Sequence, residues 1–189
     1  MNKKMKLIGA ALALTTAMFG CTSSVPYDQP TGAVSDMSAY EGVADGHFND
    51  MSVADVVQAI KDGRTMIVYF GESGCAWCKE LVPVLDEVCG DFGYNIGYVD
   101  FLLESNSSDT TSMDAFMDLC GDKISTDSSD GQKVFYFPAV VYFQKGVVLG
   151  LHFGTVSGHD AHVAKMTDAQ KARLKYLLTE EFAAVTEKQ

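Results

Sequence analysis

The fold of this chain is decided by one stretch, Thr65-Met66-Ile67-Val68-Tyr69-Phe70-Gly71-Glu72-Ser73-Gly74-Cys75-Ala76-Trp77-Cys78-Lys79. Residues 66–70 are apolar, β-branched or aromatic, which predicts a buried strand. Residues 71–74 contain two glycines and predict a turn. From Cys75 onward, apolar residues recur at spacings of three and four, which predicts a helix (Leu81, Val82, Leu85, Val88 and Cys89). The sequence therefore places two cysteines, Cys75 and Cys78, on the first turn of a helix that directly follows a strand.

The start of a helix is an environment that makes a thiol reactive. The first-turn N–H groups have no partners within the helix, and they favour a negative charge. A thiolate at Cys75 is therefore stabilised and its pKa lowered, which makes this sulfur the attacking nucleophile. Cys78 lies one turn further along the same side of the helix and is placed to form a disulfide with Cys75. The alternative interpretation is a static disulfide or a pair of inert thiols.

Length and composition set the broad class of the protein. The chain has 189 residues, of which 47% are hydrophobic, and a formal net charge of −11. That length suffices for one domain with a sizeable core. Nucleic-acid binding needs clustered Lys and Arg against phosphate, so we expect no nucleic-acid partner for so acidic a chain. We interpret the negative charge as a contribution to solubility.

Residues 1–20 have the pattern of an export signal peptide. Residues 2–6 are basic, and residues 7–19 form an apolar segment that is too short to span a bilayer comfortably but suits a signal peptide. Gly20-Cys21 follows this segment, and the whole pattern resembles a bacterial lipoprotein signal, in which the cysteine is lipidated and becomes the mature N-terminus. Met18 and Phe19 depart from the usual residues of that signal. The alternative is an ordinary secretory leader with an incidental cysteine, and both interpretations export the protein to a compartment where disulfides persist.

Composition divides the remaining chain into two parts. Residues 21–48 are rich in Ser, Thr, Gly, Asp and Pro and predict a flexible tether. Residues 49–189 predict one α/β domain with a mixed sheet, because helical and strand patterns alternate along it. The expected elements are a helix capped by Ser52, the strand 66–70, the cysteine helix, a strand 94–101, a polar loop 104–112, a helix 113–120, a polar loop 125–132, strands 135–143 and 147–153, and a helix 167–185 capped by Thr167.

The chain resembles a thioredoxin-fold protein over roughly residues 49–186. Five features carry the resemblance: Cys75-Ala76-Trp77-Cys78 at a helix start, Pro83 inside that helix, Phe137-Pro138 before the late strand, Lys145-Gly146 in the hairpin, and Gly154 after the last strand. A lone Cys-x-x-Cys is weak evidence, since zinc sites use the same spacing. The resemblance implies a mixed central sheet flanked by helices, with a cis-proline beside the disulfide.

The chain also departs from thioredoxins at three points. Tyr69 stands where that family has a buried acid thought to help deprotonate the inner thiol. Gly74 replaces the usual Trp, and Ala76-Trp77 replaces Gly-Pro between the cysteines. In overall texture the sequence is loosely similar to the exported thioredoxin-like group that includes bacteriocin-transport accessory proteins.

The resemblance implies a catalytic set of Cys75, Cys78 and Pro138, with no bound cofactor. Cys75 would capture a disulfide of the partner, and Cys78 would resolve the mixed disulfide. Pro138 would present an extended backbone edge to the substrate and shield the disulfide from metal ions. The alternative is a proline that only begins a strand, where its missing N–H costs nothing.

Further side chains are auxiliary candidates. Trp77 and Phe137 either touch a partner or belong to the core. His159 and His162 follow Gly154, where a thioredoxin chain passes near its active site. They predict a proton relay that replaces the missing acid, a zinc or copper site together with the two cysteines, or, as we prefer, a solvated loop.

Two cysteines remain, Cys89 and Cys120, each followed by a glycine. In an oxidising compartment they could pair, but we favour two buried thiols that behave as small hydrophobic groups.

Together these patterns predict an extracytoplasmic thiol–disulfide oxidoreductase that is anchored to the bacterial cell membrane by Cys21. Its partners would be exported proteins with thiols or disulfides and a membrane redox partner. The alternative is a non-enzymatic accessory module of an export or surface system that keeps the fold. The sequence leaves open whether the enzyme reduces, oxidises or isomerises, and it makes no prediction of the oligomeric state.

Overall fold

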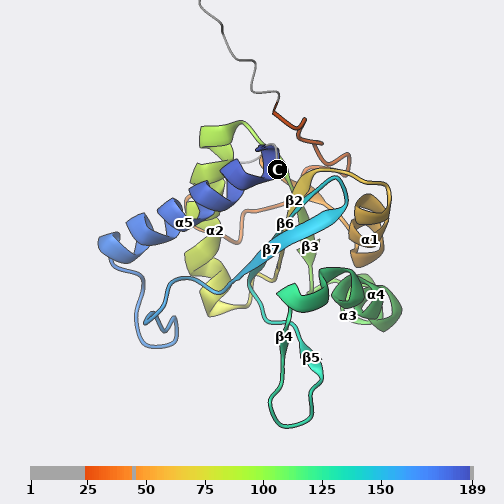
Figure 1. Cartoon of the computed structure of the whole chain (residues 1–189). Coiled ribbons are helices and arrows are strands. Elements are labelled where there is room, and N and C mark those ends of the chain that lie inside the picture. Colours follow the sequence, from red (N-terminus) through yellow and green to blue (C-terminus); the bar gives the residue numbers. More distant parts are fainter. Residues whose placement is uncertain (1–23, 44–45, 188–189) are drawn as a thin grey trace, which may run out of the picture.

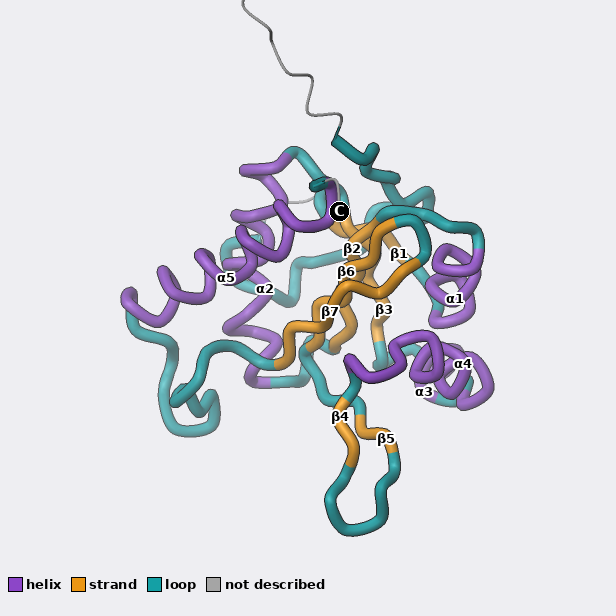
Figure 2. Tube along the Cα trace, in the orientation of Figure 1, coloured by secondary structure: helices purple, strands orange, loops and turns teal. Residues whose placement is uncertain are grey.

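The computed structural model describes residues 24–43 and 46–187, and its centre is a five-stranded mixed sheet (Figures 1 and 2). The strand order is β1 (Phe48–Asp50), β3 (Ile96–Asp100), β2 (Met66–Gly71), β6 (Ala139–Gln144) and β7 (Val147–Phe153). The first three strands in this order run parallel, whereas β6 is antiparallel to β2 and β7 is antiparallel to β6. The carboxyl ends of β2 and β3 therefore lie at the same edge of the sheet as the start of β6.

Helices cover both faces of the sheet (Figure 1). On one face α2 (Ala76–Phe92) packs against α5 (Asp168–Thr186), and on the other α1 (Val53–Lys61) packs against α4 (Thr110–Cys120). The alternation of β2 explains how both layers are held, because successive side chains of a strand point to opposite faces. Ile67 and Tyr69 belong to the core under α2 and α5, and Val68 and Phe70 belong to the core under α1 and α4. This is the thioredoxin-like α/β fold that the sequence predicted.

The expected helix caps and hairpin turn are confirmed. The Ser52 hydroxyl accepts from the backbone N–H of Asp55, whose carboxylate in turn accepts from the N–H of Ser52, so two otherwise unpaired N–H groups are satisfied. Thr167 forms the same reciprocal cap with Gln170 at the start of α5. Lys145 and Gly146 both have positive φ, 49° and 76°, as a two-residue hairpin between β6 and β7 requires.

Several expected boundaries were wrong. The stretch 104–112 is not a loop throughout, because it contains the short helix α3 (Glu104–Ser107) and the first turn of α4, which Asp109 caps. The stretch 125–132 is also not all loop, because it contains β4 (Ser125–Thr126) and the tip that joins β4 to β5 (Lys133–Val134) in a hairpin, which projects from the body of the molecule in Figure 1. The strand expected over 135–143 begins only at Ala139, after the cis Phe137–Pro138 bond. Strand β1 was not predicted, because three residues are too few to show a strand pattern.

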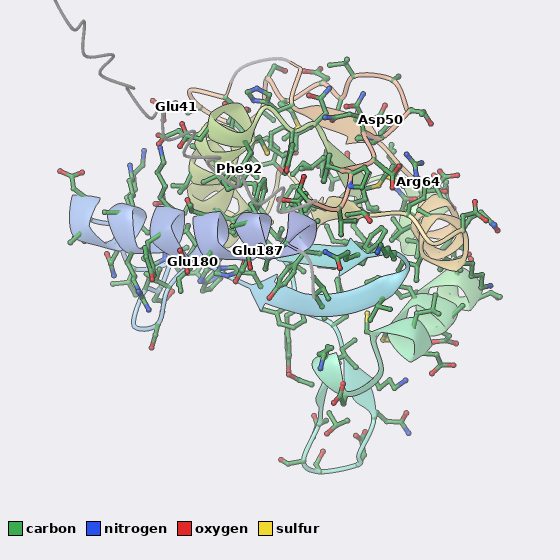
Figure 3. The ribbon with its side chains drawn as sticks, turned by 45° about the horizontal axis from the view of Figure 1, so that its top comes forward. Glu41, Asp50, Arg64, Phe92, Glu180 and Glu187 are labelled. Atoms are coloured by element: carbon green, nitrogen blue, oxygen red, sulfur yellow. The ribbon has the colours of Figure 1, made fainter. Side chains whose placement is uncertain are left out.

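The predicted flexible tether over residues 21–48 was also wrong for the part that the structure describes. Met37 and Tyr40 are only 1% and 3% exposed, and Tyr27 stacks on the Tyr94 ring at 3.9 Å between centroids. Arg64, labelled in Figure 3, donates to the carbonyl of Gln29 at 2.8 Å. Single side chains hold this segment against the domain, and they do not recur at helix or strand spacing, so neither the sequence pattern nor the composition revealed them. The domain therefore begins well before residue 49.

A further aromatic contact lies on the same face of the sheet, between α2 and α5. Phe92 of α2, labelled in Figure 3, lies 5.5 Å from Phe182 of α5 between ring centroids.

Residues 1–23, including the predicted signal and Cys21, lie outside the described residues. Among residues 24–43 and 46–187, no helix has both the length and the apolar character needed to cross a bilayer.

Candidate active site

The two cysteines lie where strand β2 gives way to helix α2. Cys75 has extended backbone angles, φ −77° and ψ 125°, and is the N-cap residue directly before the first helical residue, Ala76. Its sulfur accepts a hydrogen bond from the backbone N–H of Cys78 at 3.1 Å. A thiol in this position thus takes the place that a Ser or Asp oxygen usually fills at a helix start. The predicted placement of a cysteine at the head of this helix is confirmed, one residue earlier than the first helical turn.

The surroundings of the two sulfurs give them different acidities. Hydrogen bonds from the Cys78 thiol and from the backbone N–H groups of Cys78 and Trp77 lower the pKa of Cys75 to about 7, although partial burial and the Glu72 charge oppose this. Cys78 is fully buried, and its pKa is raised by its interaction with Cys75 and by burial. A sulfur that is partly exposed and acidic beside one that is buried and protonated is the arrangement that disulfide exchange needs.

The Phe137–Pro138 junction lies at the same end of the sheet. Ala139 pairs with Phe70 of β2, which sets the buried Pro138 beside the end of that strand, and the bond before Pro138 is cis. The Pro138 carbonyl accepts from the N–H of Gly154 at 2.9 Å. The Phe137 ring packs 4.4 Å from Phe101 between centroids, which favours the core interpretation of Phe137.

One of the two candidate histidines reaches the cysteine motif. The exposed His162 ring meets the Trp77 ring edge to face, 4.5 Å between centroids. His159 instead braces its own loop, with Nδ1 at 2.7 Å from the Thr155 hydroxyl and Nε2 at 3.0 Å from the Ala164 carbonyl. Trp77 is therefore a partly exposed surface group between the cysteines, flanked by the loop that carries His162.

The metal alternative receives no support from this geometry. Within the part of the chain that the structure describes, no three side chains among His, Cys, Asp and Glu gather as a ligand group. His159 uses both ring nitrogens inside its loop, as described above.

Cys89 and Cys120 are buried separately. Cys89 belongs to the core on the α2 side of the sheet and Cys120 to the core on the α4 side, and both are free thiols. Burial raises the pKa of Cys89, and it raises that of Cys120 to about 12. The structure therefore bears out the buried-thiol interpretation and not a disulfide between the two.

A cluster of three tyrosines beneath Cys78 was largely missed by sequence reasoning. Tyr69 of β2 and Tyr98 of β3 are register partners, and their rings stack at 5.2 Å between centroids. The Tyr40 hydroxyl lies 3.5 Å from both of their hydroxyls. The strand pattern could have paired Tyr69 with Tyr98, but no signal pointed to Tyr40, since it comes from the segment predicted as a tether.

Fold and site together define a thioredoxin-like domain with a Cys-x-x-Cys pair at the start of α2. No protein-family model and no curated protein matches the chain. Among solved structures, thioredoxin O1 from Arabidopsis thaliana in the oxidized state is similar over 72% of this chain and 99% of its own, with 15% identity and a TM-score of 0.43. Thioredoxin O2 from the same organism is similar over 71% of this chain and 93% of its own, with 17% identity and a TM-score of 0.42.

Proposed function

We propose that this protein is a thiol–disulfide oxidoreductase in which Cys75 attacks and Cys78 resolves. The observation that carries the proposal is the N-cap position of Cys75. There, backbone N–H groups and the neighbouring thiol lower its pKa to about 7, while the resolving sulfur lies buried one turn away. About half of Cys75 is then thiolate at neutral pH, whereas an unperturbed thiol is only a few per cent ionised.

The exchange proceeds in two balanced steps. The Cys75 thiolate attacks one sulfur of a protein disulfide, so that a mixed disulfide forms, the substrate S–S bond breaks, and the leaving sulfur takes a proton from water. Cys78 then loses its proton and attacks Cys75, which forms the Cys75–Cys78 bond and releases the second substrate sulfur. The substrate disulfide gains two electrons and two protons, and the dithiol loses them. A membrane redox partner would return the dithiol to its starting state.

Apolar side chains near the site support a protein as the substrate. Leu102 and Leu103 lie just beyond the end of β3, at the edge of the sheet where α2 begins, and they are 57% and 52% exposed. Val163, next to His162 in the loop that meets Trp77, is 80% exposed. Exposed apolar groups on the segments around a reactive thiol favour a polypeptide partner. A non-enzymatic accessory module would use the same surface, and turnover separates the two functions.

Turnover of a model protein disulfide with a dithiol donor tests the proposal. The wild-type protein should reduce or isomerise the substrate, Cys75→Ser should abolish turnover, and Cys78→Ser should accumulate mixed disulfides that gel electrophoresis without reductant resolves. Cys89→Ser is the matched control, because that thiol is buried away from the site. If the wild type shows no turnover with any dithiol donor, the accessory-module function replaces this one.

The reduction potential of the Cys75–Cys78 pair would decide the direction of catalysis. A value near that of thioredoxin, about −270 mV, indicates a reductase, and one near about −120 mV indicates an oxidase. Equilibration with glutathione buffers of graded ratio measures it.

We also propose, from the leader sequence, that the protein is exported and anchored through lipidated Cys21. Residues 2–21 carry the basic start, the short apolar segment and the Gly20-Cys21 junction of such a signal. Fractionation of bacteria that express the full chain should place it with the membrane, and labelling with a fatty-acid analogue should mark it. Cys21→Ser should lose the label, and an unlabelled wild type would contradict lipidation.

A further inference from the structure

The proposed chemistry, on which this inference rests, requires the buried Cys78 to lose a proton. Its side chain is 0% exposed, so water does not reach the thiol directly. The groups that act on the Cys78 thiol through hydrogen bonds are the side chains of Cys75 and Tyr69 and the backbone of Glu72. During resolution Cys75 is bound in the mixed disulfide and is no longer available as a base. The Tyr69 hydroxyl is then the side-chain group against Cys78 that can take its proton.

The Tyr69 hydroxyl begins a line of polar groups that leads away from Cys78. It lies 3.5 Å from the Tyr40 hydroxyl, which lies 3.5 Å from the Tyr98 hydroxyl. Burial raises the pKa of Tyr98, and the carboxylate of Asp100, two residues after Tyr98 on the same strand, interacts with the Tyr98 hydroxyl and raises that pKa further. The three tyrosines are at most 4% exposed, whereas Asp100 is half-buried at the end of β3. The line therefore connects a fully enclosed thiol to a carboxylate that water reaches.

The neighbouring backbone leaves room for this arrangement. Gly71 lies two residues after Tyr69 on the same face of β2, and a Cβ atom there would clash with the Tyr69 hydroxyl. The absence of a side chain at Gly71 allows the Tyr69 ring to lean along the strand, toward the end at which α2 begins. Tyr98, opposite Tyr69 in register, stacks against the ring and holds it there.

We propose that Tyr69, Tyr40 and Tyr98 form a hydroxyl relay that carries the Cys78 proton to Asp100 during resolution. The S–H proton passes to the Tyr69 oxygen as the Tyr69 proton passes to Tyr40, and Tyr40 and Tyr98 repeat the exchange. Asp100 receives the last proton and later releases it to water. All three phenols end neutral, and the Cys78 thiolate forms the Cys75–Cys78 bond while the substrate thiolate leaves.

Burial makes a stable phenolate unfavourable in this cluster. It raises the pKa of Tyr40 to about 12, and it raises the pKa values of Tyr69 and Tyr98 as well. Each hydroxyl must therefore give up a proton as it accepts one. The titratable groups that bear on the path are Cys75 from the start of α2, Glu72 from the preceding turn, the three phenols, and Asp100 from β3.

A chromophoric disulfide separates the two steps. Reduced full-length protein with Cys21→Ser is mixed with dithiobis(nitrobenzoate) in a stopped-flow absorbance experiment. Attack by Cys75 releases the first coloured thiolate, and resolution by Cys78 releases the second. Tyr69→Phe should slow the second release by about 100-fold, the lower range for a lost proton-transfer group. Tyr98→Phe and Asp100→Asn should slow the same release and weaken its dependence on pH.

A double variant distinguishes a relay from separate packing effects. Because members of one relay act as a unit, Tyr98→Phe should slow resolution in the wild type but add little in the Tyr69→Phe background. Tyr176→Phe, at an exposed tyrosine of α5, is the matched control and should leave both releases unchanged. Circular dichroism verifies that each variant is folded.

The outcomes separate this proposal from the function beneath it. Should Tyr69→Phe resolve at the wild-type rate, or should the two Tyr→Phe effects multiply in the double variant, the relay is overturned while exchange by the cysteines stands. A wild type that releases no first thiolate, or a Cys78→Ser variant that releases both at the wild-type rates, overturns the exchange chemistry itself.

Discussion

Replacing Gly71 by alanine should destabilise the protein through one contact. An ideal Cβ atom at this position would clash with the Tyr69 hydroxyl and lie 2.5 Å from its Cζ atom. Ordinary contact begins near 3.4 Å, so the ring has to move by about 1 Å. Tyr69 is 0% exposed and contacts the stacked Tyr98 ring and the edge of Phe48, so a shift of its ring disturbs both contacts.

The expected size of the effect follows from overpacking of a filled core. Such substitutions cost about 1–3 kcal/mol. With a urea m-value of about 2 kcal/mol/M, the unfolding midpoint should fall by about 0.5–1.5 M. Equilibrium urea unfolding of the reduced protein, followed by circular dichroism, measures this shift.

Two further variants make the reasoning specific. In Gly71→Ala/Tyr69→Phe the worst clash is gone, because Phe lacks the hydroxyl, so the double variant should lose at least about 0.5 kcal/mol less than the sum of the single losses. Gly90→Ala is the control, because Gly90 is an exposed position of α2 and a Cβ atom there would lie 3.4 Å from the His47 ring, an ordinary contact. This variant should leave the stability unchanged or raise it by up to about 1 kcal/mol. A Gly71→Ala protein that unfolds at the wild-type urea concentration would refute the argument.

Three other expectations follow. The rate of Cys75 alkylation by iodoacetamide should have its pH midpoint near the Cys75 pKa of about 7 and fall about tenfold for each pH unit below it, because only the thiolate reacts and the lowered pKa keeps it present above that pH. Mass spectrometry of the modified peptide measures this rate. A midpoint near that of an unperturbed thiol would contradict the N-cap argument. Met37→Ala should reduce the free energy of unfolding by about 2–5 kcal/mol because the side chain is 1% exposed, whereas a tether would show no loss in the same urea experiment. Ser52→Ala should cost about 1 kcal/mol through loss of the α1 cap, and Ser52→Asp, which retains an acceptor, should recover most of it in thermal unfolding.

The strand–turn–helix around the cysteines was predictable because local patterns specify it. Residues 66–70 are all apolar, β-branched or aromatic, and the apolar spacing after Cys75 matches one helix face. The chemistry of Cys75 followed from the same local fact, since unpaired N–H groups belong to every helix start. Caps at Ser52 and Thr167 and the turn at Lys145 were equally local, and the structure confirms them.

The sequence alone did not reveal several contacts between segments that lie far apart in the chain. Tyr40 reaches the active-site cluster from a stretch whose composition resembled a linker, 29 residues before Tyr69 and 58 before Tyr98. Burial of one side chain leaves no period to detect, and the fully enclosed position of Cys78 depends on elements that close over it only after folding. The local sequence pattern therefore determined the position of the Cys75 sulfur. The groups that face the buried Cys78 were decided by the tertiary structure, because they come from distant segments that meet only when the chain folds.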